Sequence, residues 1–155
     1  MAKLEVLENK KLVLKNVLVN KLRGISFEDV DKEISKFVNK LNILNVKTFG
    51  PLVIKSYGTN IHEDGTITTD YDLIVQAHDY KQYKSNYDIQ ERYECPHCVY
   101  IHYEGVPEDV NYATIKLDLY FYENELESNG EMYSVYIHDS EDYIVTDFFR
   151  PVIRT

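Results

Sequence analysis

"VLVNKLRGISFEDV" (residues 17–30) decides the fold, because a similar stretch returns later in the chain as "CVYIHYEGVPEDV" (98–110). Both stretches run from a strand-like segment through a glycine and a short loop into Glu-Asp-Val, and Gly24 and Gly105 occupy the same corner. Such self-similarity at a long period indicates two copies of one structural unit.

The first copy extends from this stretch into a β-α-β-β pattern. Residues 12–20 are rich in Val and Leu and predict a strand, and apolar residues at three- and four-residue spacing predict an amphipathic helix over about 27–44. "GPLVIKSYG" (50–58) and "DYDLIVQAH" (70–78) predict two further strands, with turn residues between them. Repeat one is therefore expected over about 12–79.

The second copy follows a polar, Tyr-rich segment at 80–94, which has no clear period and is predicted to be a connector. Repeat two, over about 95–152, begins with a predicted strand at 98–105 and closes with strands at 132–139 and 143–152. The predicted fold class is α+β, with duplicated βαββ units that form antiparallel sheet, two long helices and a pseudo-two-fold axis. At 155 residues a single domain is expected, with a natural cleft between the halves.

The second helix is expected to begin at Pro107 and to end at Asn129-Gly130. It carries two apolar stripes, one of Ala113, Leu117 and Phe121 and one of Ile115, Leu119, Tyr122 and Leu126. A helix that is apolar over so wide an arc is expected to be largely covered by protein.

The "CPHC" sequence (95–98) leaves three alternatives, a redox centre, a metal site or two ordinary thiols. A reactive Cys-x-x-Cys pair has its first thiolate at a helix N-terminus, but the residues after Cys98 predict a strand. A structural zinc site needs four ligands, and Cys95, His97 and Cys98 supply three. We therefore expect no metal and no cofactor, with Pro96 at a strand entrance and two small, weakly polar cysteines.

Charge and hydropathy restrict the partners. The net charge of −9 and the pI near 5.0 disfavour nucleic-acid binding, whereas a cationic small molecule or a basic protein is compatible. There is no apolar run of membrane-spanning length and residues 1–16 lack signal-peptide features, so a cytoplasmic protein without membrane contact is expected. The repeat pair leaves no room for a helix-turn-helix segment, so the domain is expected to stand alone or act through a partner.

Three stretches together share the order and spacing of a known motif set. They are "GPLVIKSYG" (50–58), "CPHCVYIHYEGVPEDV" (95–110) and "VYIHDSEDYIVTDFFRPV" (135–152). Over about 12–152 the chain resembles the GyrI-like family, the effector-binding domain also found in AraC-type and MerR-type transcription activators. The matching positions are Pro96, Gly105, Val110, Val135, Tyr136, Asp139, Thr146, Asp147, Pro151 and Val152.

The resemblance implies a non-catalytic domain that binds a cationic or aromatic small molecule between its two halves. In the family, aromatic side chains stack on the ligand and a buried carboxylate lies opposite its charge. Carried over to this sequence, the carboxylate falls on Asp147 and the strand tyrosine of the first half on Tyr57. Tyr100, Tyr133 and Tyr136 are expected to be further aromatic walls.

Two other functions stay open. The chain departs from the family at Ser134 and Cys98, where the family has Glu and Tyr, and it has no Trp. With the acidic charge, these departures leave an acidic protein-interaction or immunity-type partner protein as the alternative. A hydrolase is the third, since a few relatives act on strained rings and His102 and His138 lie in predicted strands.

Overall fold

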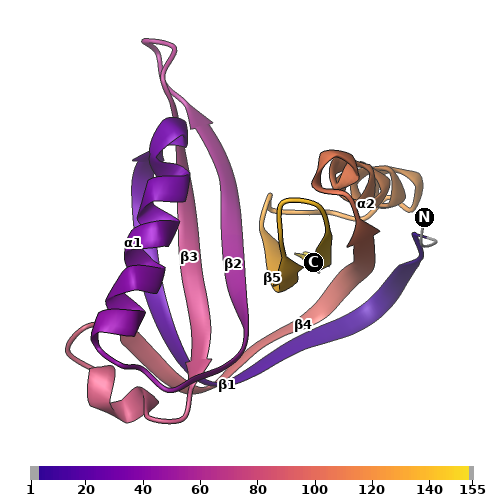
Figure 1. Cartoon of the computed structure of the whole chain (residues 1–155). Helices are drawn as coiled ribbons and strands as arrows, with labels where there is room; N and C mark the ends of the chain where they lie inside the picture. Colours follow the sequence, from indigo (N-terminus) through magenta and orange to yellow (C-terminus); the bar gives the residue numbers. More distant parts are fainter. Residues whose placement is uncertain (1–3, 154–155) are drawn as a thin grey trace. The chain divides into compact units, whose positions relative to one another are not determined.

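The computed structural model describes residues 4–153, and these form six β-strands, two α-helices and three short 3-10 helices (Figure 1). In chain order they are β1 Val6–Ser26, η1 Phe27–Asp29, α1 Val30–Ile43, β2 Thr48–Ile61, β3 Ile67–Ala77, η2 Tyr80–Tyr83, β4 Asp88–Gly105, η3 Pro107–Asp109, α2 Asn111–Glu123, β5 Met132–Asp139 and β6 Ile144–Pro151. The fold is α+β, as predicted. Within residues 4–153, neither α-helix has the length and apolar content needed to cross a membrane.

The chain divides into two compact units with the same order of strand, 3-10 helix, α-helix, strand and strand. One unit contains Leu14–Tyr93, and the other contains the residues from Glu94 onward together with those up to Val13. In each unit the last strand lies between the other two, in the antiparallel orders β1-β3-β2 and β4-β6-β5. The predicted duplication of a βαββ unit is confirmed.

The two helices also end alike. Asn45 after α1 and Glu125 after α2 both have a left-handed backbone, with φ of 56° and 55°. In each case the next residue donates its N–H to the carbonyl five residues earlier, at 3.0 Å from Val46 and 2.9 Å from Leu126. This pattern is the Schellman motif, which satisfies carbonyls at a helix C-terminus. The prediction that the second helix ends at Asn129-Gly130 is wrong, because Glu125 already turns the chain.

Among residues 4–153, the residues that pack on α2 cover one side of it. Its buried stripe packs against β4 and β6 and consists of Ala113, Leu117 and Phe121. Its second stripe is at least half exposed and includes Ile115, Leu119 and Tyr122. The expectation of a broadly covered helix is wrong, because the strands of the unit lie against one side of α2 only.

Two strands are longer than the apolar patterns indicated. β1 starts at Val6 and β4 at Asp88, whereas the sequence predicted strands from 12 and from 98. The additional segments include the polar runs 8–11 and 90–92, whose side chains are exposed, so no apolar alternation marked them as strand. The segment 80–94 is therefore more than a connector, since it contains η2 and the start of β4.

Gly24 and Gly105 stand at the same corner of the two units for different reasons. Gly24 has a left-handed backbone, with φ of 63°, and open space where a Cβ atom would be. At Gly105 a Cβ atom would lie 2.8 Å from the hydroxyl of Tyr103, a buried side chain that donates a hydrogen bond to the carbonyl of Val106. Gly24 thus allows a left-handed backbone, whereas Gly105 leaves space for the side chain of Tyr103.

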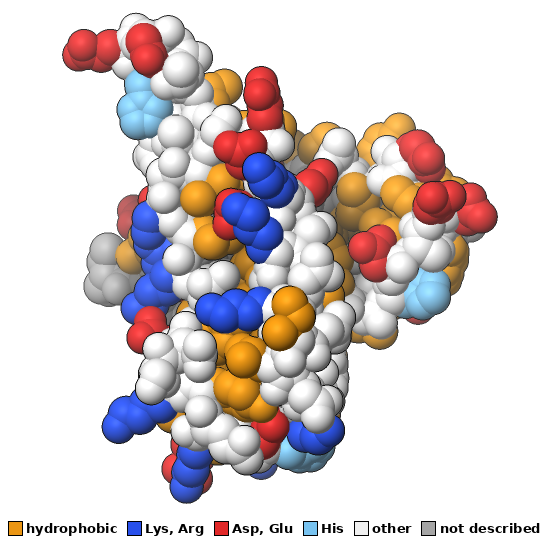
Figure 2. All heavy atoms as spheres, turned by 60° about the vertical axis from the view of Figure 1, so that its left-hand side comes forward, with side chains coloured by type: hydrophobic (Ala, Val, Ile, Leu, Met, Phe, Trp, Pro, Cys, Tyr) orange, Lys and Arg blue, Asp and Glu red, His pale blue; other side chains and the backbone are white. Residues whose placement is uncertain are grey.

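Figure 2 shows the side of the molecule that carries α1. Lys and Arg side chains are spread over this face with apolar side chains between them, and acidic side chains stand out at the tip of the β2–β3 hairpin. That tip is a turn in which Asp64 Oδ1 accepts hydrogen bonds from the backbone N–H and the hydroxyl of Thr66, at 3.0 Å and 2.7 Å. The basic side chains of this face are dispersed rather than gathered in one patch.

Candidate ligand-binding site

The candidate site is on the face of β4, β6 and β5 that points away from α2. Val99, Ile101 and Tyr103 of β4 belong to the core that includes the buried stripe of α2. Because successive side chains of a strand point to opposite faces, Tyr100 and His102 point to the other face.

Antiparallel pairing arranges this face in rows, since directly opposed residues share a face. One row across β4, β6 and β5 is His102, Asp147 and Val135. The adjoining row is Tyr100, Phe149 and Tyr133. Asp147 and an aromatic platform, the row of Tyr100, Phe149 and Tyr133, therefore lie side by side. Tyr100 and Phe149 are partly exposed, and Tyr133 is buried beside them.

Asp147 accepts two hydrogen bonds on the same oxygen. The hydroxyl of Tyr100 donates to Asp147 Oδ1 at 2.9 Å, and Nδ1 of His102 lies 2.5 Å from it. The Asp147 side chain is 19% exposed, so its charge is partly withdrawn from water. Burial and the bond to Asp147 raise the pKa of Tyr100, which stays a neutral donor, and its ring lies 5.0 Å from that of Phe149.

His102 joins two acids. Its Nε2 lies 2.9 Å from Glu104 Oε1, and the hydroxyl of Tyr143 donates to Glu104 Oε2 at 3.1 Å. Burial alone would lower the pKa of His102, but the hydrogen bonds to Glu104 and Asp147 outweigh it and raise that pKa. The bond to His102, followed by that from Tyr143, lowers the pKa of Glu104. The imidazole is thus stabilised in its charged form.

Of the five residues predicted for the site, Asp147, Tyr100, Tyr133 and Tyr136 lie in one unit and Tyr57 lies in the other. Tyr100 and Tyr133 lie on the face of Asp147, in the adjoining row. Tyr136 is paired with Thr146 and so belongs to the other face of β5. Tyr57 lies in the unit Leu14–Tyr93, where it contacts a different acid.

That acid is Asp72 of β3, the counterpart of Asp147. It lies between Lys21 and Lys55 of the neighbouring strands, and its side chain is only 6% exposed. The hydroxyl of Tyr57 donates to Asp72 Oδ2 at 2.5 Å. Arg23 Nη2 lies 2.9 Å from Asp72 Oδ1 as an ion pair, and the guanidinium stands over the Tyr57 ring at 4.8 Å from its centroid. A cation over an aromatic face beside a carboxylate is therefore already present here, supplied by the chain itself.

The surroundings of Asp72 reinforce this arrangement. The row adjoining it is aliphatic and consists of Val19, Ile74 and Val53. Lys55 Nζ lies 4.5 Å from the Tyr57 ring centroid, while Lys21 pairs with Asp88 at 3.1 Å. Burial and the bond to Asp72 raise the pKa of Tyr57, and in Arg23 the bond to Asp72 outweighs burial and raises the guanidinium pKa further.

Sequence reasoning missed Asp72, Arg23 and the partnership of His102 with Asp147. The alternation in "DYDLIVQ" places Asp72 opposite the face of Tyr71 and Leu73, which was a usable signal for an acid on an inner strand. The pairing of His102 with Asp147 depends on the register between β4 and β6, which the sequence pattern alone does not supply.

The cysteine pair lies inside β4 and not at its entrance, so the prediction for Pro96 is wrong. His97 has a left-handed backbone with φ of 59°, which interrupts the strand geometry between the two cysteines. Cys98 is buried and Cys95 partly so, with 3.5 Å between their sulfur atoms. The neighbouring Cys95 and burial both raise the pKa of the Cys98 thiol, which disfavours its thiolate.

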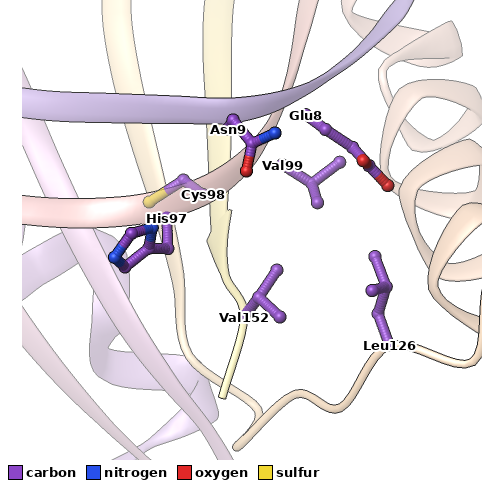
Figure 3. A pocket seen from close by; sticks show the side chains of 7 residues that line it. All are labelled: Glu8, Asn9, His97, Cys98, Val99, Leu126 and Val152. Atoms are coloured by element: carbon purple, nitrogen blue, oxygen red, sulfur yellow. The ribbon is translucent and has the colours of Figure 1, made fainter. Parts of the chain in front are cut away.

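A small cavity adjoins this segment. Figure 3 shows Val99, Leu126 and Val152 around it, with His97 and Cys98 on the strand beside them. Its volume is about 60 Å³. Sites for drug-sized molecules have roughly 300–1,000 Å³, so this cavity has room for little more than water.

Comparison with known proteins identifies structural neighbours only. No family model matches the chain, and no curated protein matches it. The C-terminal domain of EcmrR has a TM-score of 0.63 at 13% identity, with 99% of this chain and 98% of that one covered. An uncharacterised conserved protein from Listeria innocua has a TM-score of 0.62 at 13% identity, with 97% and 92% covered.

SAV2435, solved with bound tetraphenylphosphonium, has a TM-score of 0.50 at 11% identity, with 98% of this chain and 94% of that one covered. Similarity at this level of identity shows the fold and not the activity. The chain thus shares its α+β fold with these neighbours.

Proposed function

We propose that this protein is a small-molecule-binding domain in which Asp147 recognises an organic cation beside the aromatic platform. The observation that carries the proposal is the row of Tyr100, Phe149 and Tyr133 next to a carboxylate that is 19% exposed. A carboxylate partly removed from water favours a cationic partner, and aromatic faces attract cations. Together they select a ligand that is both positively charged and apolar.

One structural neighbour supports the same ligand class. SAV2435 was solved with tetraphenylphosphonium, a permanent cation that carries four aromatic rings. A shared fold does not transfer an activity, but it makes this cation the natural first probe.

Asp147 is a better candidate than Asp72 for a physical reason. The charge of Asp72 is balanced by Arg23, which stays protonated at any physiological pH. Its side chain is also the less exposed of the two, at 6%. An incoming cation would have to displace a guanidinium from an aromatic face and a carboxylate at once.

The proposed function is binding without catalysis. A general base needs a nitrogen or oxygen free to take a proton from a substrate. Both ring nitrogens of His102 lie within hydrogen-bond distance of carboxylates, Asp147 on one side and Glu104 on the other. Neither ring nitrogen is therefore free to take a proton from a substrate.

The test is calorimetric titration with tetraphenylphosphonium, with triphenylphosphine oxide as the uncharged aromatic control. We expect the cation to bind and the neutral compound to bind at least about tenfold more weakly, a difference of about 1.4 kcal/mol. Asp147→Asn keeps the shape and the acceptor oxygen but removes the charge, and it should weaken cation binding by a similar factor.

Asp142→Asn is the matched control, because it removes one negative charge from an exposed position of the same unit. It should leave the affinity within about twofold, since exposed charges are screened by salt. Equal loss of binding in both variants, or undiminished binding to Asp147→Asn, would overturn the assignment of Asp147.

A further inference from the structure

Two carboxylates lie within hydrogen-bond distance of the His102 ring in the free protein. Nδ1 lies 2.5 Å from Asp147 Oδ1 and Nε2 lies 2.9 Å from Glu104 Oε1. Ionised carboxylates only accept hydrogen bonds, so both ring nitrogens must carry hydrogen atoms. A neutral imidazole has only one such hydrogen, so two contacts with carboxylates favour the imidazolium.

The groups around the ring make this cation the local counter-charge of two acids. Asp147 reaches it from β6, and Glu104 reaches it from β4 itself. Tyr100 donates to Asp147 and Tyr143 donates to Glu104, and both are neutral. The cluster thus contains two negative charges and one positive charge, and the positive charge is removable.

An organic cation that approaches Asp147 therefore meets a positive charge already in place. The organic cation and the imidazolium of His102 would then both lie beside the Asp147 carboxylate, and like charges a few ångströms apart repel each other. The chain can relieve this repulsion by releasing one proton from His102 to solvent. The neutral ring still carries one hydrogen, with which it can donate to Glu104.

Resting on the function proposed above, we propose that an organic cation binds at Asp147 in exchange for the proton of His102. One positive charge enters and one leaves, so the charge of the cluster is unchanged by binding. His102 thereby makes the site sensitive to pH, whereas Arg23 at the equivalent acid of the other unit does not release its proton.

The direction of the pH effect follows from linkage. In the free protein the bonds to Glu104 and Asp147 raise the pKa of His102 above the ordinary value near 6.5, and a bound cation would lower it. Between these two pKa values, binding releases a proton. Affinity should therefore increase with pH by at most about tenfold per unit, and become constant once the free ring is neutral.

The experiment is calorimetric titration of tetraphenylphosphonium from pH 5.5 to 9, in phosphate and in Tris where their buffering ranges overlap. The dependence of the heat on buffer ionisation counts the protons released. In the wild type we expect up to one proton per cation and a stronger affinity at higher pH. His102→Gln should bind with one affinity throughout, about tenfold tighter than the wild type at the lowest pH.

His102→Lys is the matched variant, because it keeps a positive charge that does not leave in this pH range. It should bind weakly at every pH, with no proton release. A wild-type pH dependence that persists in His102→Gln would overturn the exchange.

The exchange and the proposed function fail in different ways. Binding that needs Asp147 but shows neither pH dependence nor proton release would overturn the exchange alone. No binding at any pH would overturn both. An NMR titration without ligand adds an independent check, since the His102 ring should titrate at higher pH in the wild type than in Asp147→Asn. Equal titration in the two proteins would contradict the pairing on which the exchange depends.

Discussion

The two units place an aspartate at the same position of their central strands and surround it differently. Asp72 is almost fully buried, and its partner Arg23 carries a permanent charge. Asp147 is more exposed, and its partner His102 carries a charge that can be lost near neutral pH. In one unit the equivalent aspartate is neutralised by a permanently charged arginine. In the other unit it is neutralised by a histidine that can lose its charge.

The largest effect on the free energy of unfolding is expected at Asp72, the buried acid. Asp72→Asn removes the charge that pairs with Arg23 inside the sheet, and unfolding in urea should show a loss of about 2–3 kcal/mol. Asp147→Asn should cost less than about 1 kcal/mol, because this acid is partly solvated. Equal losses for the two variants would contradict the statement that Asp72 contributes more to stability than Asp147.

The next largest effect on stability is expected at Arg23, the cationic partner of Asp72. Arg23→Met leaves Asp72 with the Tyr57 hydroxyl but without a counter-charge, and we expect a loss of about 1–2 kcal/mol at pH 7. Lys21→Met is the control, since it breaks only the exposed pair with Asp88 and should cost at most about 0.5 kcal/mol. A loss in Arg23→Met no larger than that in Lys21→Met would contradict the role given to the Arg23 charge.

The two corner glycines sharpen the comparison further. Gly105→Ala forces a methyl group against the Tyr103 hydroxyl and should cost about 1–2 kcal/mol of unfolding free energy. Gly24→Ala should cost about 1 kcal/mol for its left-handed backbone alone. Asparagine tolerates that backbone, so Gly24→Asn should cost less than Gly24→Ala, whereas Gly105→Asn should be no better than Gly105→Ala. The opposite order would show that the two corners are alike.

The smallest effect concerns the pH dependence of stability. A pKa that folding raises contributes stability below the unfolded pKa, and this stability is lost as pH rises through the folded value. The raised pKa of His102 therefore predicts that the wild type exceeds His102→Gln by less than about 1 kcal/mol at pH 5.5, and by nothing at pH 9. Urea titrations at both values measure this, and a difference that grows with pH would contradict the sign.

The sequence predicted the duplication because glycine corners and apolar helix periods are local signals. The matching stretches around Gly24 and Gly105 led to two βαββ units, which the structure confirms. Strand lengths were missed where side chains are exposed, as at 90–92, since such residues show no alternation of apolar and polar character. The end of α2 was missed because the residue in the left-handed conformation is Glu125. A glycine at this position would have been a recognisable signal for the end of a helix.

The candidate site was less predictable, because it depends on register. Tyr100, Tyr133 and Asp147 share a face, but Tyr136 belongs to the other face and Tyr57 to the other unit. A one-residue difference in register exchanges the faces of a strand, and single-sequence patterns do not fix the register of distant strands. For the same reason the partnership of His102 with Asp147 became visible only in the structure.

The central claim is that Asp72 stabilises the fold whereas Asp147 binds the cation. One set of urea titrations tests this claim directly. Asp72→Asn and Asp147→Asn are each unfolded with and without saturating tetraphenylphosphonium, since a ligand that binds the folded state adds to its stability. We predict that Asp72→Asn starts less stable yet gains as much from the cation as the wild type, while Asp147→Asn starts close to the wild type and gains little. If Asp72→Asn lost the gain, or if Asp147→Asn kept it, the division of tasks between the two acids would be contradicted.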